Sequence, residues 1–380
     1  MDFSFNDDHL ALRDAVQRFC EAEYPQEHRG NPQTPAQAQQ RHTAMAELGV
    51  LGLPFSAEVG GSEQGPIELM LVAQEMGRAL GGGAWVASTV MAGEVLTRLG
   101  SDAQQQRCLP ALASGTQQAA LAMYETGARY DWQHTHTTAT PSGEGWRLNG
   151  RKTGVLQGDG AHVLLVVART SGDVADRAGL SVFVVDARAP GVTVQGFDTL
   201  DNRRSAHVTL QDVQVSADQL LGPVGQAADA IEAALDAATC ALCAEAAGAV
   251  EALLTHTAEH LRTRKQFGAP LAKFQVLQHR VADMAMALEQ LKSMACAAAM
   301  AMQSPDPVQR RRLVSAAKVL ASQKGREIGL TAIQLHGAMG MTDECRVGHY
   351  AKRLIVIGQS LGDAAWHLQR MTSAHPTLCH

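Results

Sequence analysis

The sequence of 380 residues lacks the features typical of membrane proteins, nucleic-acid-binding proteins and secreted proteins. Aromatic residues make up only 4% of it, and no window of about 18 uninterrupted apolar residues is present, so we expect no transmembrane helix. The formal net charge is −6, and no basic patch with interleaved aromatic residues occurs, which argues against a nucleic-acid partner. The first residues, MDFSFNDDHL, lack the basic start and apolar stretch of a signal peptide. We therefore expect a cytoplasmic protein that binds neither nucleic acid nor a membrane.

Common cofactor and metal motifs are also missing. Neither GxxxxGK[ST] nor a GxGxxG between a strand and a helix occurs, so the sequence supports no P-loop and no Rossmann unit. The seven scattered cysteines, an odd number, favour free thiols in a reducing compartment. Cys240 and Cys243 form a CxxC without a second pair, and His256 to His260 fits the HxxEH pattern of zinc peptidases without an evident distal ligand. We expect no metal site and interpret both motifs as ordinary helical positions.

The spacing of apolar residues divides the chain into three blocks. Residues 1–117 have apolar residues at helical spacing, residues 118–226 are rich in strand-like runs, and residues 227–380 contain long helical segments. The pair Asn149-Gly150 predicts a type I′ hairpin turn in the central block. We predict a mainly α protein with a middle β-barrel domain and a C-terminal four-helix bundle. The bundle helices are expected at residues 227–263, 274–302, 307–335 and 347–373.

Two motifs in the last block resemble the signatures of the acyl-CoA dehydrogenase family. Residues 264–284 read RKQFGAPLAKFQVLQHRVADM and residues 334–340 read QLHGAMG, in the order and separation typical of that family. The three-block layout is similar as well, so the resemblance covers essentially the whole chain. It implies an oligomeric, FAD-dependent oxidoreductase that acts on acyl-CoA substrates by α,β-dehydrogenation. It also implies an electron-transferring flavoprotein as the partner that accepts the electrons.

The resemblance further implies that one set of residues touches FAD held mainly by a neighbouring subunit. The permanently charged guanidinium of Arg264 suits a pyrophosphate, and Gly337 allows backbone to approach a ligand closely. The amide of Gln334 can both donate and accept a hydrogen bond. The full set of cofactor-binding residues implied in this way is Arg264, Gln266, Phe267, Gln334, Gly337 and Ala338.

The family's catalytic carboxylate is absent from its two usual places. Counting from the second motif, the usual glutamate falls at Leu361, and the alternative position on the first bundle helix is Ala238. Neither side chain can accept a proton, and Thr239 stands where an arginine often helps to bind the substrate. Glu245 is the substitute base that the spacing offers, although it lies two helical turns beyond Ala238, or about 10 Å. The catalytic base is therefore left open.

Further departures affect the residues with which a family member binds its own flavin. Arg129 and Tyr130 replace a glycine and a serine in the loop YETGARYD, and residues 154–156 replace a Trp-Ile-Thr segment. The residues that would contact the FAD of a neighbouring subunit are retained. We therefore predict that this chain is the partner subunit in a heterotetramer with a second acyl-CoA dehydrogenase subunit. In its residue pattern along the whole chain, the sequence looks most similar to the small subunit of pimeloyl-CoA dehydrogenases and related heteromeric bacterial enzymes. The alternatives are a self-sufficient dehydrogenase with a relocated base, a non-catalytic scaffold, or a flavin oxidase or monooxygenase on the same fold. The acyl group, whether fatty, dicarboxylic or a steroid side chain, is not identified.

Overall fold

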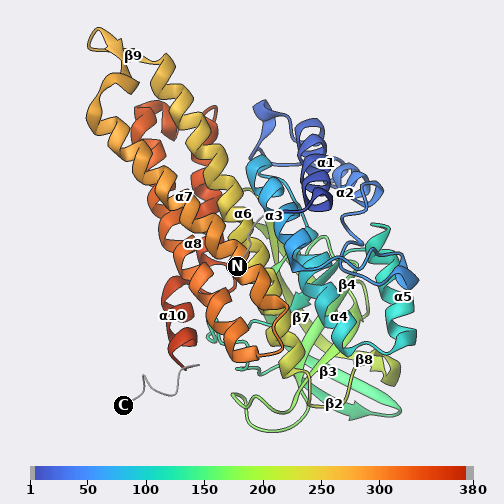
Figure 1. Cartoon of the computed structure of the whole chain (residues 1–380). Coiled ribbons are helices and arrows are strands. Elements are labelled where there is room, and N and C mark those ends of the chain that lie inside the picture. The colour runs from blue at the N-terminus through green and yellow to red at the C-terminus, as the bar shows by residue number, and fades with distance from the viewer. Residues whose placement is uncertain (1–4, 374–380) are drawn as a thin grey trace.

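The computed structural model describes residues 5–373 and has helices from both ends of the chain beside a sheet that lies at one side of the molecule (Figure 1). Asn6 starts the first helix by accepting a hydrogen bond from the N–H of His9, and Thr34 with Gln37 forms a capping box at the second. The N-terminal elements are α1 (Asp7–Glu23), α2 (Pro35–Glu47), α3 (Pro66–Ala79), a π-helical segment (Val86–Ala92), α4 (Gly93–Leu99) and α5 (Asp102–Ala113).

The middle of the chain forms an eight-stranded sheet in the order β6-β7-β3-β2-β4-β5-β8, with β1 pairing in parallel with β4. A separate cluster of buried Val, Leu and Ala side chains fills its interior. The strands are β1 (Ala119–Ala122), β2 (Thr138–Ser142), β3 (Gly145–Leu156), β4 (Val163–Arg169), β5 (Leu180–Asp186), β6 (Val192–Asp198), β7 (Arg204–Ser216) and β8 (Leu220–Leu221). Since β1 follows α5 closely and α6 begins at Ala228, we propose residues 1–117, 118–226 and 227–380 as the three domains.

The Asn149-Gly150 pair does not form the predicted hairpin turn. Both residues lie inside β3, at an irregularity of its register with β7. The Asn149 side chain donates to the Asp212 carboxylate at 3.1 Å and accepts from the Asp212 N–H at 2.8 Å. A Cβ at position 150 would lie 2.3 Å from the Thr137 hydroxyl, so the glycine serves a close approach to the neighbouring segment. The prediction was wrong because pairing with β7 outweighs the local turn preference.

The C-terminal part is a bundle whose first three helices are α6 (Ala228–Thr263), α7 (Gln275–Met302) and α8 (Pro307–His336). The prediction of one continuous fourth helix was wrong. This segment forms two helices, α9 (Arg346–Gln359) and α10 (Ala364–Ser373). Leu361 and Gly362 both have positive φ, at 57° and 113°, which ends the helical path. Asp363 then caps α10 by accepting the N–H of Trp366 at 2.9 Å.

Helix α6 lies at the centre of the molecule. By length and composition it could cross a membrane, but 83% of its most apolar 18-residue window is buried inside the protein, as in a core helix. Its backbone contacts that of α3, since a Cβ on Gly77 would lie 2.0 Å from the Glu245 carbonyl and one on Gly248 would lie 1.8 Å from the Gln74 carbonyl. These two glycines therefore fix the distance between α6 and the N-terminal helices.

Candidate functional site

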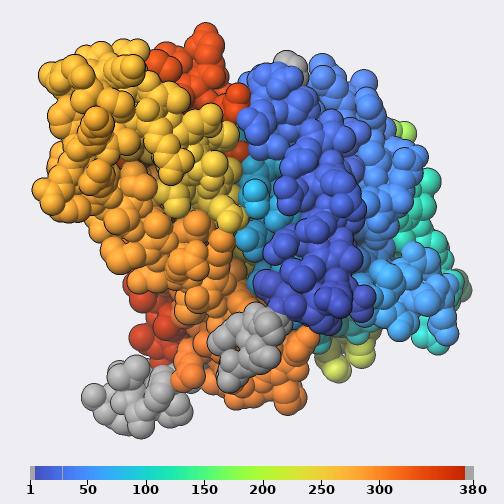
Figure 2. All heavy atoms as spheres, turned by 45° about the horizontal axis from the view of Figure 1, so that its top comes forward, coloured from blue at the N-terminus to red at the C-terminus, as the bar shows by residue number. Residues whose placement is uncertain are grey.

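A short hairpin at the far end of the bundle carries the first motif. Strands β9 (Lys265–Gln266) and β10 (Ala269–Pro270) pair antiparallel, and Phe267 and Gly268 between them have φ of 53° and 76°. The Phe267 side chain is 88% exposed. In Figure 1 the hairpin is the outermost point of the bundle, and in Figure 2 the yellow tip stands away from the blue N-terminal helices. The phenyl ring is thus exposed at the tip of the hairpin, with the Phe274 ring 6.0 Å away between centroids.

The two sequence motifs line one groove beside this hairpin. Gly337, with φ of 65°, ends α8 and starts a short 3-10 helix (Gly337–Met341). The structure brings together all of the predicted cofactor residues except Phe267, which lies at the hairpin tip outside the groove; those in the groove are Arg264, Gln266, Gln334, Gly337 and Ala338.

The same groove contains residues that were not predicted to bind the cofactor. Arg280, on the exposed side of α7, lines it, because the hairpin turns α7 back beside α6. The imidazoles of His260 and His336 line it as well and stack with centroids 4.2 Å apart. Arg280 belongs to the first motif, one and a half turns into α7, but no pattern in the motif marked it as a contact of the cofactor.

The polar groups of the groove suit a dinucleotide cofactor. Within residues 5–373, no carboxylate lies within ion-pair distance of Arg264 or Arg280. The side-chain amides of Gln266 and Gln334 likewise have no hydrogen-bond partner there. Guanidiniums and amides free in this way match the phosphate and hydroxyl groups of a flavin dinucleotide.

The positions of the family's catalytic carboxylate lie in an apolar setting. Leu361 is buried in the break between α9 and α10, and Ala238 is fully buried on α6. The carboxylates closest to them in sequence are engaged in ion pairs. Asp363 lies 3.6 Å from Arg129 while it caps α10, and Asp236 contacts the guanidinium of Arg370 at 2.5 Å. Both carboxylates are thus engaged with other groups of the protein.

The loop that resembles the family's own flavin loop closes onto α10. Arg129, which stands in place of a glycine, keeps a left-handed φ of 53°. Tyr130 packs against Trp366 with ring centroids 6.4 Å apart and donates a hydrogen bond to Gln359 at 3.3 Å. The loop thus contacts α9 and α10 through bulky side chains where the family pattern has a glycine and a serine.

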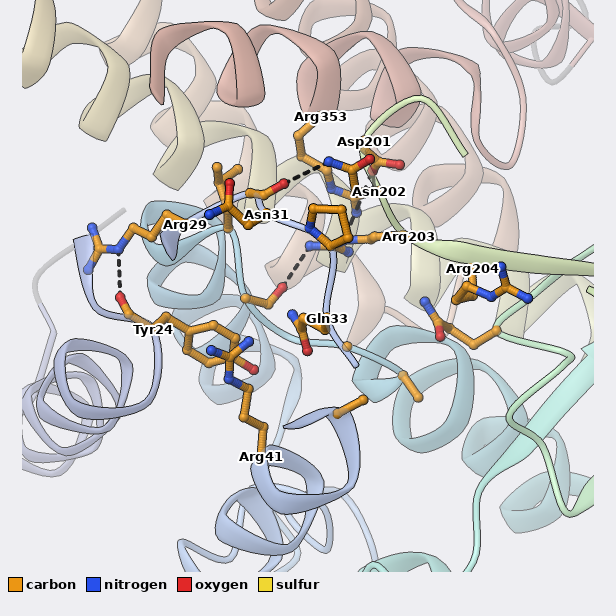
Figure 3. A pocket seen from close by; sticks show the side chains of 18 of the residues that line it. Tyr24, Arg29, Asn31, Gln33, Arg41, Asp201, Asn202, Arg203, Arg204 and Arg353 are labelled. Atoms are coloured by element: carbon orange, nitrogen blue, oxygen red, sulfur yellow. Dashed lines mark hydrogen bonds and ion pairs between the residues drawn. The ribbon is translucent and has the colours of Figure 1, made fainter. Parts of the chain in front are cut away.

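Glu245 is buried and held by two guanidiniums. Its oxygens accept from Nε and Nη2 of Arg353 at 2.8 and 2.6 Å and from Nη2 of Arg203 at 2.6 Å. Asp201 completes the network through Arg353 Nη1 at 2.8 Å (Figure 3 shows both arginines and Asp201). Burial alone would raise the pKa of Glu245, but Arg203 and Arg353 lower it below its ordinary value. This setting disfavours Glu245 as a catalytic base.

The two short motifs that suggested metal or redox chemistry lie in helical packing. His256 packs against Tyr350 at 5.9 Å between ring centroids. Within residues 5–373, no group of three or more His, Cys, Asp or Glu side chains is arranged to hold a metal ion. Cys240 and Cys243 are free and buried, and burial raises the pKa of both thiols. Both sites have the surroundings of structural residues.

Comparison with known proteins adds the identity of the fold. The family models for the N-terminal, middle and C-terminal domains of acyl-CoA dehydrogenases match residues 6–116, 120–213 and 225–372. The chain belongs to the acyl-CoA dehydrogenase family. The predicted fold class is therefore confirmed, and the protein is an FAD-dependent oxidoreductase of the type that acts on CH–CH bonds.

Several members of the acyl-CoA dehydrogenase family are similar over most of this chain. It is 29% identical to the probable acyl-CoA dehydrogenase YngJ of Bacillus subtilis over 100% of both chains. It is 28% identical to the caffeyl-CoA reductase-Etf complex subunit CarC of Acetobacterium woodii, over 80% of each chain. Among solved structures, the ChsE4-ChsE5 complex from Mycobacterium tuberculosis is similar with a TM-score of 0.86 at 26% identity, covering 98% of each chain.

Proposed function

We propose that this acyl-CoA dehydrogenase is the partner subunit of a heteromer and completes the FAD site of a second subunit. The observation that carries the proposal is the contrast between two regions. Arg264 and Arg280 line a groove and have no carboxylate partner among residues 5–373, whereas Tyr130 packs against Trp366 in the loop that resembles the family's own flavin loop. A chain built in this way can bind part of a neighbour's cofactor but has no place for its own.

The residues of the groove have binding and orienting roles in this proposal. FAD, when bound, supplies the acceptor for hydride from the β-carbon of the acyl thioester. Arg264 and Arg280 neutralise phosphate charge, and Gln334 hydrogen-bonds to the cofactor. The exposed Phe267 packs against the second subunit. Removal of the α-proton falls to that subunit, because this chain has no free carboxylate at the family's positions.

Two relatives support a multi-subunit assembly. The ChsE4-ChsE5 structure is a complex of two proteins, and CarC is a subunit of a complex that includes Etf. We propose by analogy a heterotetramer that passes electrons to an electron-transferring flavoprotein, in the cytoplasm. The similarity to small subunits of pimeloyl-CoA dehydrogenases favours the same role, with the acyl-CoA substrate selected by the second subunit.

The test begins with the visible absorption and native mass of the chain purified alone and after co-expression with a second family member that has the catalytic glutamate. We expect a colourless protein alone and a yellow complex with the partner. One flavin per chain in the lone protein would contradict the proposal and favour a self-sufficient enzyme. A complex that consumes oxygen on adding acyl-CoA would be an oxidase or monooxygenase.

Variants of the groove test the shared site directly. Arg264→Ala and Arg280→Ala should each lower flavin occupancy of the complex, because a charge-assisted hydrogen bond contributes about 1.5–3 kcal/mol. Arg262→Ala is the matched control, since Arg262 is exposed on the same helix end but does not line the groove. Equal occupancy in all three variants would count against a cofactor role for the groove.

A further inference from the structure

A second hollow lies on another face of the molecule, around the Glu245 network. It is bordered by the loop at residues 29–33, by α2, by the turn between β6 and β7, and by α9 (Figure 3). Its free volume is about 160 Å³. A cavity of about 150 Å³ can hold a molecule the size of benzene, so this hollow suits a small ligand and is far too small for a nucleotide.

One wall of the hollow carries charges that neutralise one another. Arg203 and Arg353 are paired with Glu245 and Asp201, as described above. At the rim, Arg204 pairs with two carboxylates, Asp159 and Asp198, each at 2.6 Å. These groups hold the turn between β6 and β7 in place and are not available to a ligand.

The opposite wall carries positive charge without a counterion. Arg41 lies over the Tyr24 ring, with its guanidinium carbon 4.5 Å from the ring centroid. Arg29 donates to the backbone carbonyls of Tyr24 at 2.9 Å and Arg78 at 3.3 Å. In the part of the chain that the structure describes, no carboxylate is within 4.0 Å of either guanidinium. Figure 3 shows Arg41, Tyr24 and Gln33 around the same space, and the Gln33 amide has no hydrogen-bond partner among residues 5–373.

A buried histidine gives an independent indication of a ligand. His42 lines the hollow and is only 5% exposed, and its Nε2 has no hydrogen-bond partner among residues 5–373. Burial lowers the pKa of His42 to about 4, so the imidazole is neutral at neutral pH. A buried polar atom without a partner is unfavourable, and a bound ligand that reaches it would satisfy it.

We propose that this hollow binds a small organic carboxylate. The planar fork of Arg41 matches a carboxylate, and Gln33 adds a neutral donor beside it. The carbon body of the ligand would rest on the Tyr24 ring and on Met45 and Leu80, which also line the hollow. A ligand there touches the N-terminal loop, the turn between β6 and β7, and α9 together. The site contains none of the proposed cofactor residues, so it stands independently of the shared FAD site.

Ligand-dependent thermal unfolding and titration calorimetry of the whole chain test the proposal. The probes are sodium benzoate, sodium butyrate and inorganic phosphate, each compared with sodium chloride at equal ionic strength. We expect a saturable rise in Tm with benzoate or butyrate and a smaller one with phosphate. No saturable rise with either carboxylate would overturn the proposal, and phosphate binding as tightly as the carboxylates would overturn the class of ligand.

Two variants and a matched control locate the binding. Arg41→Gln should weaken benzoate binding by about tenfold or more, as expected when a charge-assisted hydrogen bond is lost. Gln33→Glu, a change at an exposed position that leaves folding intact, places a competing carboxylate beside Arg41 and should weaken it similarly. Arg188→Gln removes the same charge from an exposed position outside the hollow and should bind as the wild type does. If all three variants bind equally well, the carboxylate lies elsewhere and the proposal fails.

Discussion

Glu245 and Arg353 form a two-point ion pair in the interior, with Arg353 Nε 2.8 Å from Oε1 and Nη2 2.6 Å from Oε2. The pair joins α6 to α9, and Arg203 adds the turn between β6 and β7 at 2.6 Å. Glu245, which helical spacing suggested as a substitute base, therefore connects α6, α9 and the turn between β6 and β7 through ion pairs. Its guanidinium partners keep it ionised and occupied.

Replacing one member of this pair should destabilise the protein strongly. Arg353→Met leaves Glu245 with one guanidinium and Asp201 with a partner 4.0 Å away, so buried charge is left poorly compensated. We expect a loss of about 3–5 kcal/mol in the free energy of unfolding, measured by urea denaturation. The double variant Glu245→Gln with Arg353→Met should be more stable than Arg353→Met alone. A wild-type urea midpoint for Arg353→Met would contradict this account.

Lys318 should make the free energy of unfolding depend on pH in the alkaline range. Its side chain is fully buried and donates to the Gly362 carbonyl at 2.6 Å, and burial lowers its pKa to about 8. A lysine in the unfolded chain has a pKa of about 10.4. Between about pH 8 and 10 the unfolded state therefore binds more protons than the folded state does. The contribution of Lys318 to the free energy of unfolding consequently rises with pH in this range. Lys318→Met lacks this contribution.

The measurement is the free energy of unfolding of wild type and Lys318→Met at several pH values from about 7 to 10. We expect the difference to move in favour of wild type as the pH rises. Because other groups titrate equally in both proteins, the difference isolates Lys318. A difference that stays constant with pH would mean that the pKa of Lys318 is not lowered in the folded protein.

Two helical glycines with different surroundings should respond in opposite ways to substitution by alanine. Gly248→Ala would place a Cβ 1.8 Å from the Gln74 carbonyl, which only a backbone shift can relieve, so we expect a loss of about 1–3 kcal/mol or more. At Gly325 on α8 the nearest atom is the flexible end of Leu354 at 3.3 Å. Gly325→Ala should therefore be neutral or stabilising, since alanine favours a helix by about 1 kcal/mol. Thermal unfolding of both variants distinguishes the cases.

The cysteines should react in two groups with a thiol reagent at about pH 8. Cys108 and Cys345 are partly exposed, whereas Cys240 and Cys243 are buried and the pKa of each is raised. Peptide-resolved mass spectrometry should find the first pair modified early and the second pair only after denaturation. Early labelling of Cys240 or Cys243 would show that α6 opens readily in the native protein.

The helices and the three-part layout could be predicted from the sequence because they follow from apolar spacing within each segment. The break at Leu361 was missed, although the short run Ser360-Leu361-Gly362-Asp363 holds a glycine and an N-cap residue, because apolar spacing continues across it. The Asn149-Gly150 turn failed for the opposite reason, since a strong local preference was outweighed by a strand that is distant in sequence.

The candidate site was predictable only in part. The groove residues Arg264 and Gln334 belong to motifs, so they could be named before the fold was known. The partners of Glu245 lie 108 and 42 positions away, at Arg353 and Arg203, and no local pattern indicates them. Arg280 joined the groove only because the hairpin reverses the chain.

The phenyl ring at the tip of the hairpin has a consequence for how the protein is made. An isolated copy displays Phe267 on a projecting turn, with Val276, Met339 and Met341 also exposed on the segments beside it. Such a surface favours self-association until another polypeptide covers it. In the proposed heteromer, an excess of this chain would leave the apolar surface uncovered, so balanced synthesis of the two polypeptides, for example from one messenger RNA, would limit aggregation as well as supply the active complex.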